Sequence, residues 1–272
     1  MPSQVEILFG YQRQSLDWSI AGNIRGQNPN ILSHLLWSNL EGINMELNPK
    51  FQLGKLWHFE IPMQINYVVN GTVTDSDYKA DNRKDRVFYA EASARGTNGY
   101  NFRPLFGPRF ALHPDLQLTL YLNYSFLSDT YYLRDSFSDR ATLNSHYKTY
   151  WHGPGSSLEA RYTIGRQVST VVLINYSIFN YSAEADWNLV DSFSHPVSFL
   201  HKARGFGYSP SLKLIYNTDT SLSFILNLGY THLHTGKGID VLYKSDGSTI
   251  KTMLNSVILK SYTFRTGMVY LF

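Results

Sequence analysis

The chain has 272 residues, of which 43% are hydrophobic and 15% aromatic, so it carries enough apolar side chains for an ordered fold and is not a disordered protein. Its formal net charge of +3 is small and its basic residues are scattered, which argues against a nucleic-acid partner. Cysteine is absent, which excludes disulfides, thiolate nucleophiles and cysteine-based metal sites.

Aromatic residues are unusually frequent, with 20 Tyr and 16 Phe, although the mean hydropathy of -0.25 is that of a water-soluble chain. No stretch approaches the roughly 18 consecutive apolar residues that a transmembrane helix needs. A transmembrane β-barrel removes this conflict, because its strands of about 10 residues alternate between a lipid-facing apolar side and a polar lumen side. The composition is therefore compatible with a barrel.

Alternation of apolar and polar residues with a period of two recurs along the whole chain, and helical periodicity is nearly absent. It is clearest in 57–70, 115–127, 206–217 and 220–235, where only Ile225 interrupts the last segment. Aromatic residues gather near the ends of the apolar phases, as in the interfacial girdles of membrane barrels. The pattern predicts ten strands, near residues 4–23, 31–50, 56–72, 85–112, 115–135, 147–165, 166–187, 205–218, 220–244 and 249–272.

Short and long connections alternate between these strands. The tight ones fall at 48–55, 113–115, 164–167 and 217–220, and the longer, polar ones at 72–86, 136–147, 188–204 and 243–250. This asymmetry is typical of bacterial outer-membrane barrels, which have short periplasmic turns, long extracellular loops and an even number of strands. We therefore predict one domain over residues 1–272, an all-β, ten-stranded antiparallel transmembrane β-barrel. A soluble β-sandwich, whose outer face is also polar, is the alternative.

The chain ends in an amphipathic strand with Phe272 as its last residue. Such a terminal aromatic residue resembles the signal that the barrel-assembly machinery of Gram-negative bacteria recognises. We therefore expect a location in the outer membrane of a Gram-negative bacterium, with outer-membrane lipids, lipopolysaccharide and this machinery as candidate partners. The first residues do not form a basic and then apolar signal sequence, so we expect the signal peptide to have been removed.

Charged residues of both signs occupy the polar phase of several predicted strands. The lumen of a ten-stranded barrel is narrow enough for side chains to fill, so we interpret these residues as a lumen network of ion pairs that stiffens the barrel. A wide diffusion pore is then not expected, and a narrow channel stays an alternative. The predicted network consists of Glu60, Glu91, Arg95, Arg103, Arg109, Glu159, Arg161, Lys213 and Arg265.

The histidines do not predict a metal site. His232 and His234 are two residues apart and therefore lie on one face of a strand, but no third ligand can be named. The glycine-containing stretch 234–238 follows a strand without opening a helix, which argues against a phosphate site. We expect no metal and no cofactor.

The stretch "VTDSDYKADNR" at 73–83 carries the strongest candidate site. Asp75 and Asp77 flank Ser76, so an extended backbone directs both carboxyl groups to one side, where their repulsion would raise one pKa. With this Asp-x-Asp-aromatic pattern in the second extracellular loop of a predicted ten-stranded barrel, the sequence resembles the omptins, which are outer-membrane aspartyl proteases. The resemblance extends to "SHLLWSNLEG" at 33–42, "YKTYWHGPG" at 147–155, and "GKGIDVLYKSDG" followed by "YTFRTGMVYLF" in the last hairpin.

In the omptins the aspartate pair works with an Asp-x-His dyad across a cleft. The resemblance places Asp186 at the dyad aspartate and Asn188 where the histidine is expected. Asparagine cannot act as a general base, and the nearest histidine is His195. Counting by two from Ile178 puts Asp186 and Asn188 on the lipid-facing phase unless a β-bulge intervenes near residues 179–180. The assignment of a catalytic site depends on that bulge, with Asp75, Asp77, Asp186 and Asn188 as its candidates.

The stretch "DSDYKADNR" also resembles a signature of the Protochlamydia-type outer-membrane proteins, a group of omptin-like barrels. In this interpretation Asp81, Asn82 and Arg83 belong to the signature as well. An Arg83 clamp on a carboxylate would order the loop, and the same residues are candidates for binding.

We expect a non-enzymatic surface barrel, in effect a degenerate omptin, whose loops 72–86, 136–147 and 188–204 form a polar extracellular cleft for a ligand or partner or serve a structural role. One alternative is an aspartyl endopeptidase that uses Asp75, Asp77 and Asp186 with His195 as an unconventional base. The other is a narrow diffusion channel.

Overall fold

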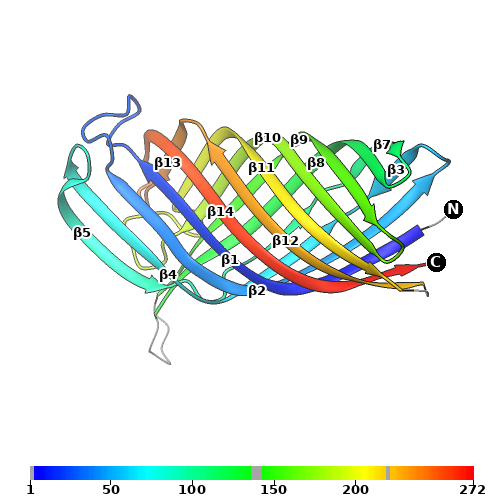
Figure 1. Ribbon diagram of the computed structural model, residues 1–272. Helices are drawn as coiled ribbons and strands as arrows, with labels where there is room; N and C mark the ends of the chain where they lie inside the picture. Colours follow the sequence, from blue (N-terminus) through cyan, green and yellow to red (C-terminus); the bar gives the residue numbers. More distant parts are fainter. Residues whose placement is uncertain (1–2, 136–142, 219–220) are drawn as a thin grey trace.

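The computed structural model describes residues 3–135, 143–218 and 221–272, and in these ranges the chain forms one antiparallel sheet of fourteen strands (Figure 1). No helix that could cross a membrane occurs in the described residues. The strands are β1 (Ser3–Ile20), β2 (Ser33–Leu53), β3 (Trp57–Glu60), β4 (Met63–Ala80), β5 (Lys84–Ser93), β6 (Asn98–Phe102), β7 (Leu105–His113), β8 (Leu116–Arg134), β9 (Asn144–Ile164), β10 (Val168–Asp186), β11 (Phe199–Asn217), β12 (Leu222–Thr235), β13 (Gly238–Tyr243) and β14 (Thr249–Leu271).

The sheet closes into a ring, because β1 pairs with β2 on one edge and with β14 on the other. The wall contains ten strands, since β3 and β4 share one position, β5, β6 and β7 a second, and β12 and β13 a third. The prediction of an all-β, ten-stranded antiparallel architecture is confirmed. Both termini lie at one end of the ring, here called the terminal end, and the opposite end is called the loop end (Figure 1).

The predicted long loop 72–86 is wrong, because this stretch is a hairpin. β4 continues to Ala80 and β5 begins at Lys84, so that only residues 81–83 form the turn. The hairpin projects at the loop end (Figure 1). Its polar residues are typical of a loop. At the loop end, however, a strand does not need an apolar outer face, so polar residues there are also compatible with a strand. The predicted loop 188–204 is shorter for the same reason, since β11 already begins at Phe199. Of the predicted loop 136–147, residues 136–142 lie outside the described residues.

A β-bulge in β2 changes which of its residues face the lumen. Gln14 of β1 is opposite Leu40, whereas Leu16 is opposite Trp37, so β2 carries an extra residue at this point. Asn39 adopts a positive φ of 50° there, a conformation that asparagine tolerates better than most residues. Even-numbered positions of β2 therefore face the lumen below the bulge, and odd-numbered positions such as Leu35 and Trp37 face it above.

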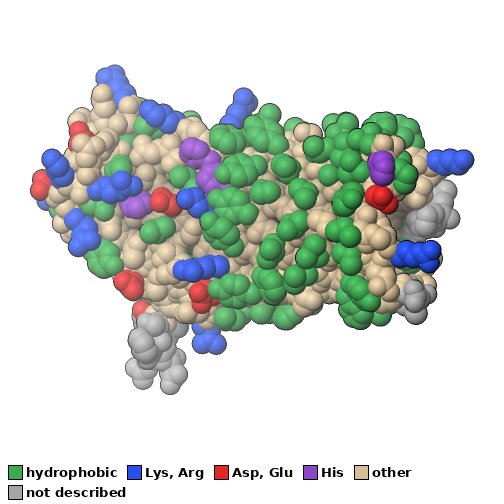
Figure 2. All heavy atoms as spheres, in the orientation of Figure 1, with side chains coloured by type: hydrophobic (Ala, Val, Ile, Leu, Met, Phe, Trp, Pro, Cys, Tyr) green, Lys and Arg blue, Asp and Glu red, His purple; other side chains and the backbone are tan. Residues whose placement is uncertain are grey.

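The outer surface is apolar over the half of the barrel nearer the terminal end. Alternate side chains of the wall strands are exposed there and form a belt, which Figure 2 shows as a band of hydrophobic side chains, whereas Lys and Arg gather at the loop end. An apolar band of this kind is what a lipid bilayer covers in outer-membrane barrels. The belt includes Phe9, Met45, Ile65, Phe102, Leu122, Leu158, Ile174, Leu214, Leu226 and Phe264.

The lumen contains two apolar clusters as well as polar side chains. The larger cluster fills the loop-end half and is dominated by the buried rings of Trp37, Tyr131, Tyr147 and Trp151. The smaller cluster lies nearer the terminal end and includes Ile225, whose departure from the alternation is explained by this inward position. Its other members are Leu8, Val171, Ile215 and Val269.

Candidate functional site: an acidic pair above a filled lumen

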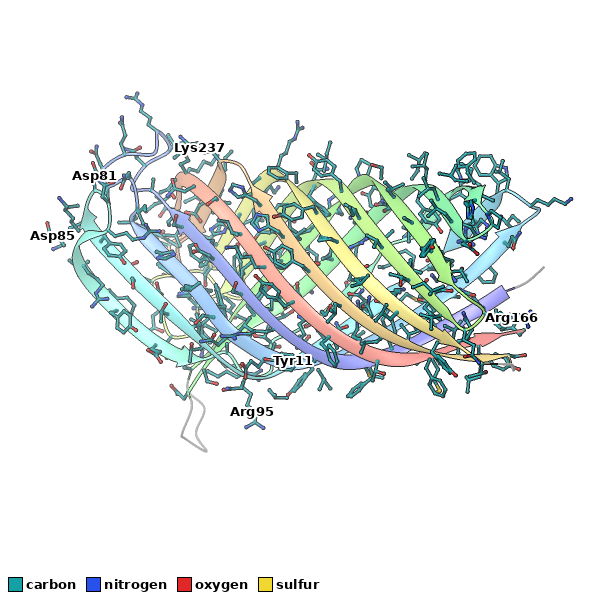
Figure 3. The ribbon with its side chains drawn as sticks, in the orientation of Figure 1. Tyr11, Asp81, Asp85, Arg95, Arg166 and Lys237 are labelled. Atoms are coloured by element: carbon teal, nitrogen blue, oxygen red, sulfur yellow. The ribbon has the colours of Figure 1, made fainter. Side chains whose placement is uncertain are left out.

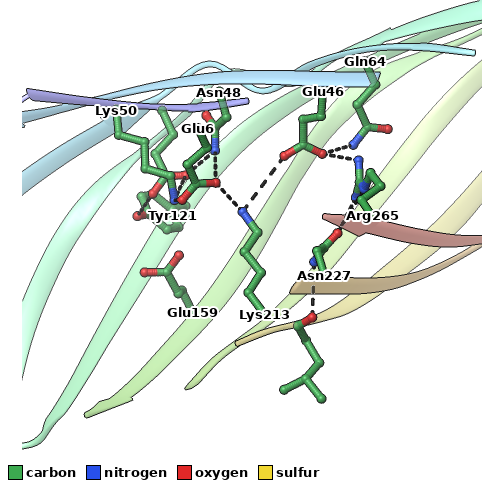
Figure 4. Close-up of polar contacts among 12 residues, drawn as sticks. Glu6, Glu46, Asn48, Lys50, Gln64, Tyr121, Glu159, Lys213, Asn227 and Arg265 are labelled. Atoms are coloured by element: carbon green, nitrogen blue, oxygen red, sulfur yellow. Dashed lines mark hydrogen bonds and ion pairs between the residues drawn. The ribbon is translucent and has the colours of Figure 1, made fainter. Parts of the chain in front are cut away.

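A buried ion-pair network crosses the lumen nearer the terminal end (Figure 4). Nζ of Lys213 on β11 lies 2.6 Å from Oε2 of Glu6 on β1. Nζ of Lys50 on β2 lies 2.9 Å from Oε1 of Glu6 and 3.0 Å from Oε2 of Glu60. The contact between Lys213 and Glu6 joins two strands that do not pair with each other, and the contacts of Lys50 join neighbouring strands. The buried charges of this part of the lumen are therefore paired rather than isolated.

A second part of the network surrounds Glu46 on β2. Arg265 of β14 forms an ion pair with Glu46, and the side-chain amide of Gln64 donates to the same carboxylate at 2.7 Å (Figure 4). Nearer the rim of the terminal end, Arg109 lies 3.3 Å from Glu159. The residues that sequence reasoning missed are Glu6, Glu46 and Lys50, although each lies on the polar phase of a predicted strand.

Two residues of the predicted lumen network lie elsewhere. Glu91 and Arg95 are exposed at the loop end, where Tyr89 donates its hydroxyl proton to Glu91 at 3.1 Å. Arg95 points away from the barrel wall (Figure 3). Glu91 occupies the outer phase of β5, because its neighbour Ala90 is opposite the inward-facing Asp75. Arg95 lies in the break between β5 and β6 and not on a strand. Both are therefore corrections to the predicted network.

Asp75 and Asp77 lie on the inner face of β4, above Val73, which belongs to the larger apolar cluster. Burial raises the pKa of Asp75 to about 7, and the negative charge of Asp77 adds to this rise, whereas Trp187 and Ser33 act in the opposite direction. Burial also raises the pKa of Asp77, against the contact from Ser33. Oδ1 of Asp75 is buried and accepts no hydrogen bond from the described residues. The two carboxyl groups therefore form an acidic pair in which Asp75 is partly protonated near neutral pH.

The β-bulge on which the catalytic assignment depended does not occur. β10 pairs with β9 in one unbroken register from Val168 to Asp186. Ala185 consequently faces the larger apolar cluster, and Asp186 occupies the outer phase. The next inward side chain is Trp187, which packs on Phe199 with ring centroids 4.8 Å apart and also contacts Asp75. An indole therefore lies where the sequence reasoning expected a carboxylate or amide.

Asn188 ties the connection that follows β10 to the first residues of β9. Its side-chain carbonyl accepts hydrogen bonds from the backbone of Asn144 at 3.0 Å and from the hydroxyl of Ser145 at 2.9 Å. Its own backbone N–H donates to the Ser145 hydroxyl at 3.1 Å. Asp186 is engaged by His195, whose Nδ1 lies 2.6 Å from its Oδ1, in an exposed position. The four proposed catalytic residues are thus divided between the inner pair Asp75 and Asp77 and the outer-phase or loop positions of Asp186 and Asn188.

The tip of the β4–β5 hairpin is fastened to the connection between β1 and β2. Asp81 accepts a hydrogen bond from the backbone N–H of Asn30 at 2.7 Å. The side-chain amide of Asn30 donates to Oδ1 of Asn82 at 3.0 Å, and its oxygen accepts from the backbone N–H of Asn82 at 2.8 Å. Asn82 and Arg83 have φ values of 61° and 58°. Among the described residues Arg83 makes no ion pair, so the predicted Arg83 clamp is wrong and Asp81 and Asn82 order the tip instead.

A buried histidine that sequence reasoning did not single out lies below this region. His201 on β11 has no solvent exposure. Its Nδ1 lies 2.7 Å from the hydroxyl of Tyr147, and its Nε2 lies 3.2 Å from Oδ1 of Asp240 on β13. The Tyr147 hydroxyl is in turn 2.5 Å from that of Tyr181. In the sequence, His201 lies in "SFLHKARGF", where apolar and polar residues alternate less clearly than in the segment that follows. The pattern therefore did not show that its side chain faces the lumen.

Aromatic rings separate this histidine from the acidic pair. Phe199 contacts Trp187 on one side and His201 on the other, with ring centroids 4.8 Å and 5.2 Å away. Trp18 packs on His201 at 4.8 Å. In the described part of the chain, no group of three or more His, Asp or Glu side chains has the arrangement of a metal site. The site therefore consists of two carboxyl groups and an indole above an aromatic layer.

The sequence matches a profile of the protein family described as Protochlamydia outer membrane protein over residues 6–272. No curated protein matches the sequence. Among solved structures, the outer membrane protease OmpT from Escherichia coli is similar with a TM-score of 0.78 and 12% identity, covering 100% of this chain and 97% of that one. The outer membrane protein OprG from Pseudomonas aeruginosa gives a TM-score of 0.39 and 13% identity, covering 99% and 95%.

Proposed function

Because this chain belongs to the Protochlamydia outer membrane protein family and folds as an omptin-like outer-membrane β-barrel, we propose that it is a surface barrel of Gram-negative type without omptin protease activity. Its loop end faces the exterior, and the acidic pair Asp75 and Asp77 with Trp187 forms a polar cleft for a ligand or partner. Outer-membrane lipids, with lipopolysaccharide among them, surround the belt, and the exposed Phe272 is the element that the barrel-assembly machinery recognises.

The observation that carries the proposal is the contact between Asp75 and Trp187. Peptide hydrolysis by an aspartate pair and a histidine needs a water molecule within hydrogen-bonding reach of both, at roughly 3 Å from each. Here an indole faces Asp75, and further rings separate the carboxyl groups from His201. An indole N–H can donate a hydrogen bond but cannot accept a proton. The arrangement therefore supports binding and offers no base for hydrolysis at this position.

The cleft suits a ligand that brings hydrogen-bond donors or positive charge. A partly protonated Asp75 can both accept and donate hydrogen bonds, and its Oδ1 has an acceptor site to offer. The indole of Trp187 adds an apolar ring face, which also attracts cations. If no ligand binds these residues, the proposal reduces to a barrel with a structural role at the cell surface.

A second candidate function is an aspartyl endopeptidase, which one observation favours. His195 lies 2.6 Å from Asp186 in an exposed pair, and a His–Asp pair can act as a general base. OmpT, whose fold is similar, is an outer membrane protease and gives this alternative its reaction class. In this case Asp75 and Asp77 would bind the attacking water and the pair of Asp186 and His195 would take its proton.

Fluorogenic peptides, including dibasic ones, separate the two candidates. We expect refolded protein in detergent with lipopolysaccharide to cleave none of them above the background of the Asp75→Asn variant. The matched control is Asp85→Asn, which changes an exposed carboxylate on the same hairpin (Figure 3). Cleavage that Asp75→Asn abolishes and Asp85→Asn retains would overturn the proposal in favour of the endopeptidase.

A narrow channel is the third candidate, and the filled lumen argues against it. Trp37, Trp151, Tyr131 and Tyr147 are all fully buried in the loop-end half, and the ion-pair network occupies the other half. We expect no steady conductance steps in planar bilayers. Regular single-channel steps from the purified protein would show that the lumen opens.

A further inference from the structure

A polar cavity of about 120 Å³ lies in the middle of the lumen, next to the ion-pair network. A water molecule occupies about 30 Å³ of liquid volume, so the cavity has room for a small ion together with water. Amide, hydroxyl and charged side chains form most of its lining. Among the residues that line it are Asn66, Asn101, Arg103, Asp129, Ser261 and Arg265.

Arg103 differs from the other charged residues of this cavity. It lies between β6 and β7, and its backbone N–H bonds to Pro62. Its side chain makes no hydrogen bond and no ion pair with the described residues, and its Nε is completely buried. The charges that act on it are those of Glu46 and Arg265. A guanidinium carries five N–H donors, and the one on Nε of Arg103 is buried without a protein acceptor.

The carboxylates near Arg103 already have partners. Glu46 binds Arg265, accepts from Gln64 at 2.7 Å and lies 4.0 Å from Lys213. Asp129 accepts from the amide of Asn66 at 3.1 Å and from the Tyr131 hydroxyl at 3.5 Å. Neither carboxylate lies within 4.0 Å of Arg103 in an ion pair of the described residues.

Most of the other cations that face the lumen have a carboxylate within ion-pair distance. Lys50 and Lys213 contact Glu6, Arg265 contacts Glu46, and Arg109 contacts Glu159. Arg103 and Arg161 have no such partner among the described residues, and of the two only Arg103 lines the cavity. A buried positive charge without a counter-charge is strongly unfavourable.

We propose that the lumen cavity binds a small inorganic anion of the size of chloride or bromide, held by the guanidinium of Arg103. Asn101 lines the same cavity with a side-chain amide whose oxygen has no partner in the described residues, so its N–H groups complete the donor set when the amide is turned toward the anion. Arg265 adds a second positive charge beside the site. The anion supplies the counter-charge that Arg103 lacks and is a structural component of the folded barrel.

The alternative is that water alone fills the cavity and bridges Arg103 to Asp129. The two explanations differ in the effect of Asp129. A water bridge needs the negative charge of Asp129 as the counter-charge of Arg103, whereas an anion is repelled by it. Asp129→Asn should therefore weaken the water-bridged arrangement and strengthen anion binding.

The test uses the full chain refolded and crystallised in sodium bromide, with sodium gluconate as the reference salt, because gluconate is too large for the cavity. We expect an anomalous bromide peak within hydrogen-bonding distance of Arg103, at roughly 3.3 Å. We also expect the urea midpoint of unfolding to rise with bromide concentration at constant ionic strength. The bromide concentration for half of this effect should increase at least tenfold in Arg103→Gln and stay unchanged in Arg83→Gln, an exposed control.

Absence of a peak beside Arg103 would overturn the proposal, and so would equal bromide dependence of the wild-type protein and Arg103→Gln. If Arg103→Gln does not fold, Asp129→Asn decides. A several-fold lower bromide concentration for half effect supports the anion, and an unchanged or higher one contradicts it.

Discussion

Nζ of Lys213 lies 2.6 Å from Oε2 of Glu6, although the two residues are 207 positions apart and belong to strands that do not pair with each other. The contact crosses the lumen between β11 and β1, so it can form only when the ring has closed. Because both groups are buried, removing one partner leaves the other as a charge that has lost part of its compensation.

Lys213→Met should therefore destabilise the barrel by about 3 kcal/mol or more. The loss should be visible as a lower urea midpoint for protein refolded into lipid vesicles. The double variant Glu6→Gln with Lys213→Met removes both charges and should recover part of the loss. Lys237→Met, at an exposed position of the loop end, is the control and should change little (Figure 3). A loss below about 1 kcal/mol for Lys213→Met would show that the pair contributes little.

The acidic pair predicts a pH dependence of stability. The pKa of Asp75 is raised from 3.8 to about 7 in the folded protein, so between these values the folded state holds a proton that the unfolded state has released. The contribution of Asp75 to stability is therefore fully present below pH 3.8 and is lost as the pH rises through about 7.

Asp75→Asn removes this titration. We expect the free energy of unfolding of the variant to fall less than that of the wild-type protein between about pH 5 and about pH 9, with a difference of at most about 3 kcal/mol. Urea unfolding at both pH values measures it, and Asp85→Asn serves as the exposed control. Parallel pH profiles of the wild-type protein and Asp75→Asn would contradict the assignment.

Tyr147→Phe tests the buried hydrogen bonds around His201. The substitution removes the hydroxyl that lies 2.7 Å from Nδ1 of His201 and 2.5 Å from the Tyr181 hydroxyl. Buried polar groups that lose a partner cost about 1–3 kcal/mol each, so the urea midpoint should fall clearly.

The chain offers a matched control for this variant. Tyr124 and His152 form the same kind of pair at 2.8 Å, but on the outer surface. Tyr124→Phe should cost less than about 1 kcal/mol, because exposed groups find other partners. Equal losses for the two variants would mean that burial of His201 is not what makes its contact important.

Asp81→Ala should loosen the hairpin tip without unfolding the barrel. The substitution removes the carboxylate that accepts the Asn30 backbone N–H at 2.7 Å, whereas the wall below keeps all its contacts. We expect faster hydrogen exchange and faster proteolytic cleavage in residues 21–32 and 81–83, with the global urea midpoint shifted by less than about 0.5 kcal/mol. Asp85→Asn, which keeps a side chain that tolerates the positive φ of 50° at this position, should leave both regions unchanged. A large global shift would place Asp81 in the folding core.

The outer face of the barrel could be predicted from the sequence, because a bilayer imposes one rule on every strand. Leu214 and Phe224 alternate with polar residues for that reason, and the ten wall strands followed from the pattern. The hairpin around Asp75 could not be predicted, because above the bilayer both faces of a strand are free to be polar.

The contacts between side chains in the lumen could not be predicted from the alternation of apolar and polar residues either. Partners such as Glu6 and Lys213 meet through closure of the ring and not through strand pairing, so no local spacing connects them. The position of Trp187 opposite Asp75 depends in the same way on the unbroken register of β10. The strands could therefore be predicted correctly while the residues that meet in the candidate site could be identified only from the three-dimensional structure.

Because of the β-bulge at Asn39, the number of residues in β2 determines which of its side chains face the lumen above this point. Deleting this single residue, or inserting one beside it, would turn Leu35 and Trp37 toward the outside and bring their neighbours into the aromatic layer. A change of two residues would keep every side chain on its own face. Relatives of this barrel should therefore differ in length above this point by even numbers of residues, unless a second bulge restores the phase.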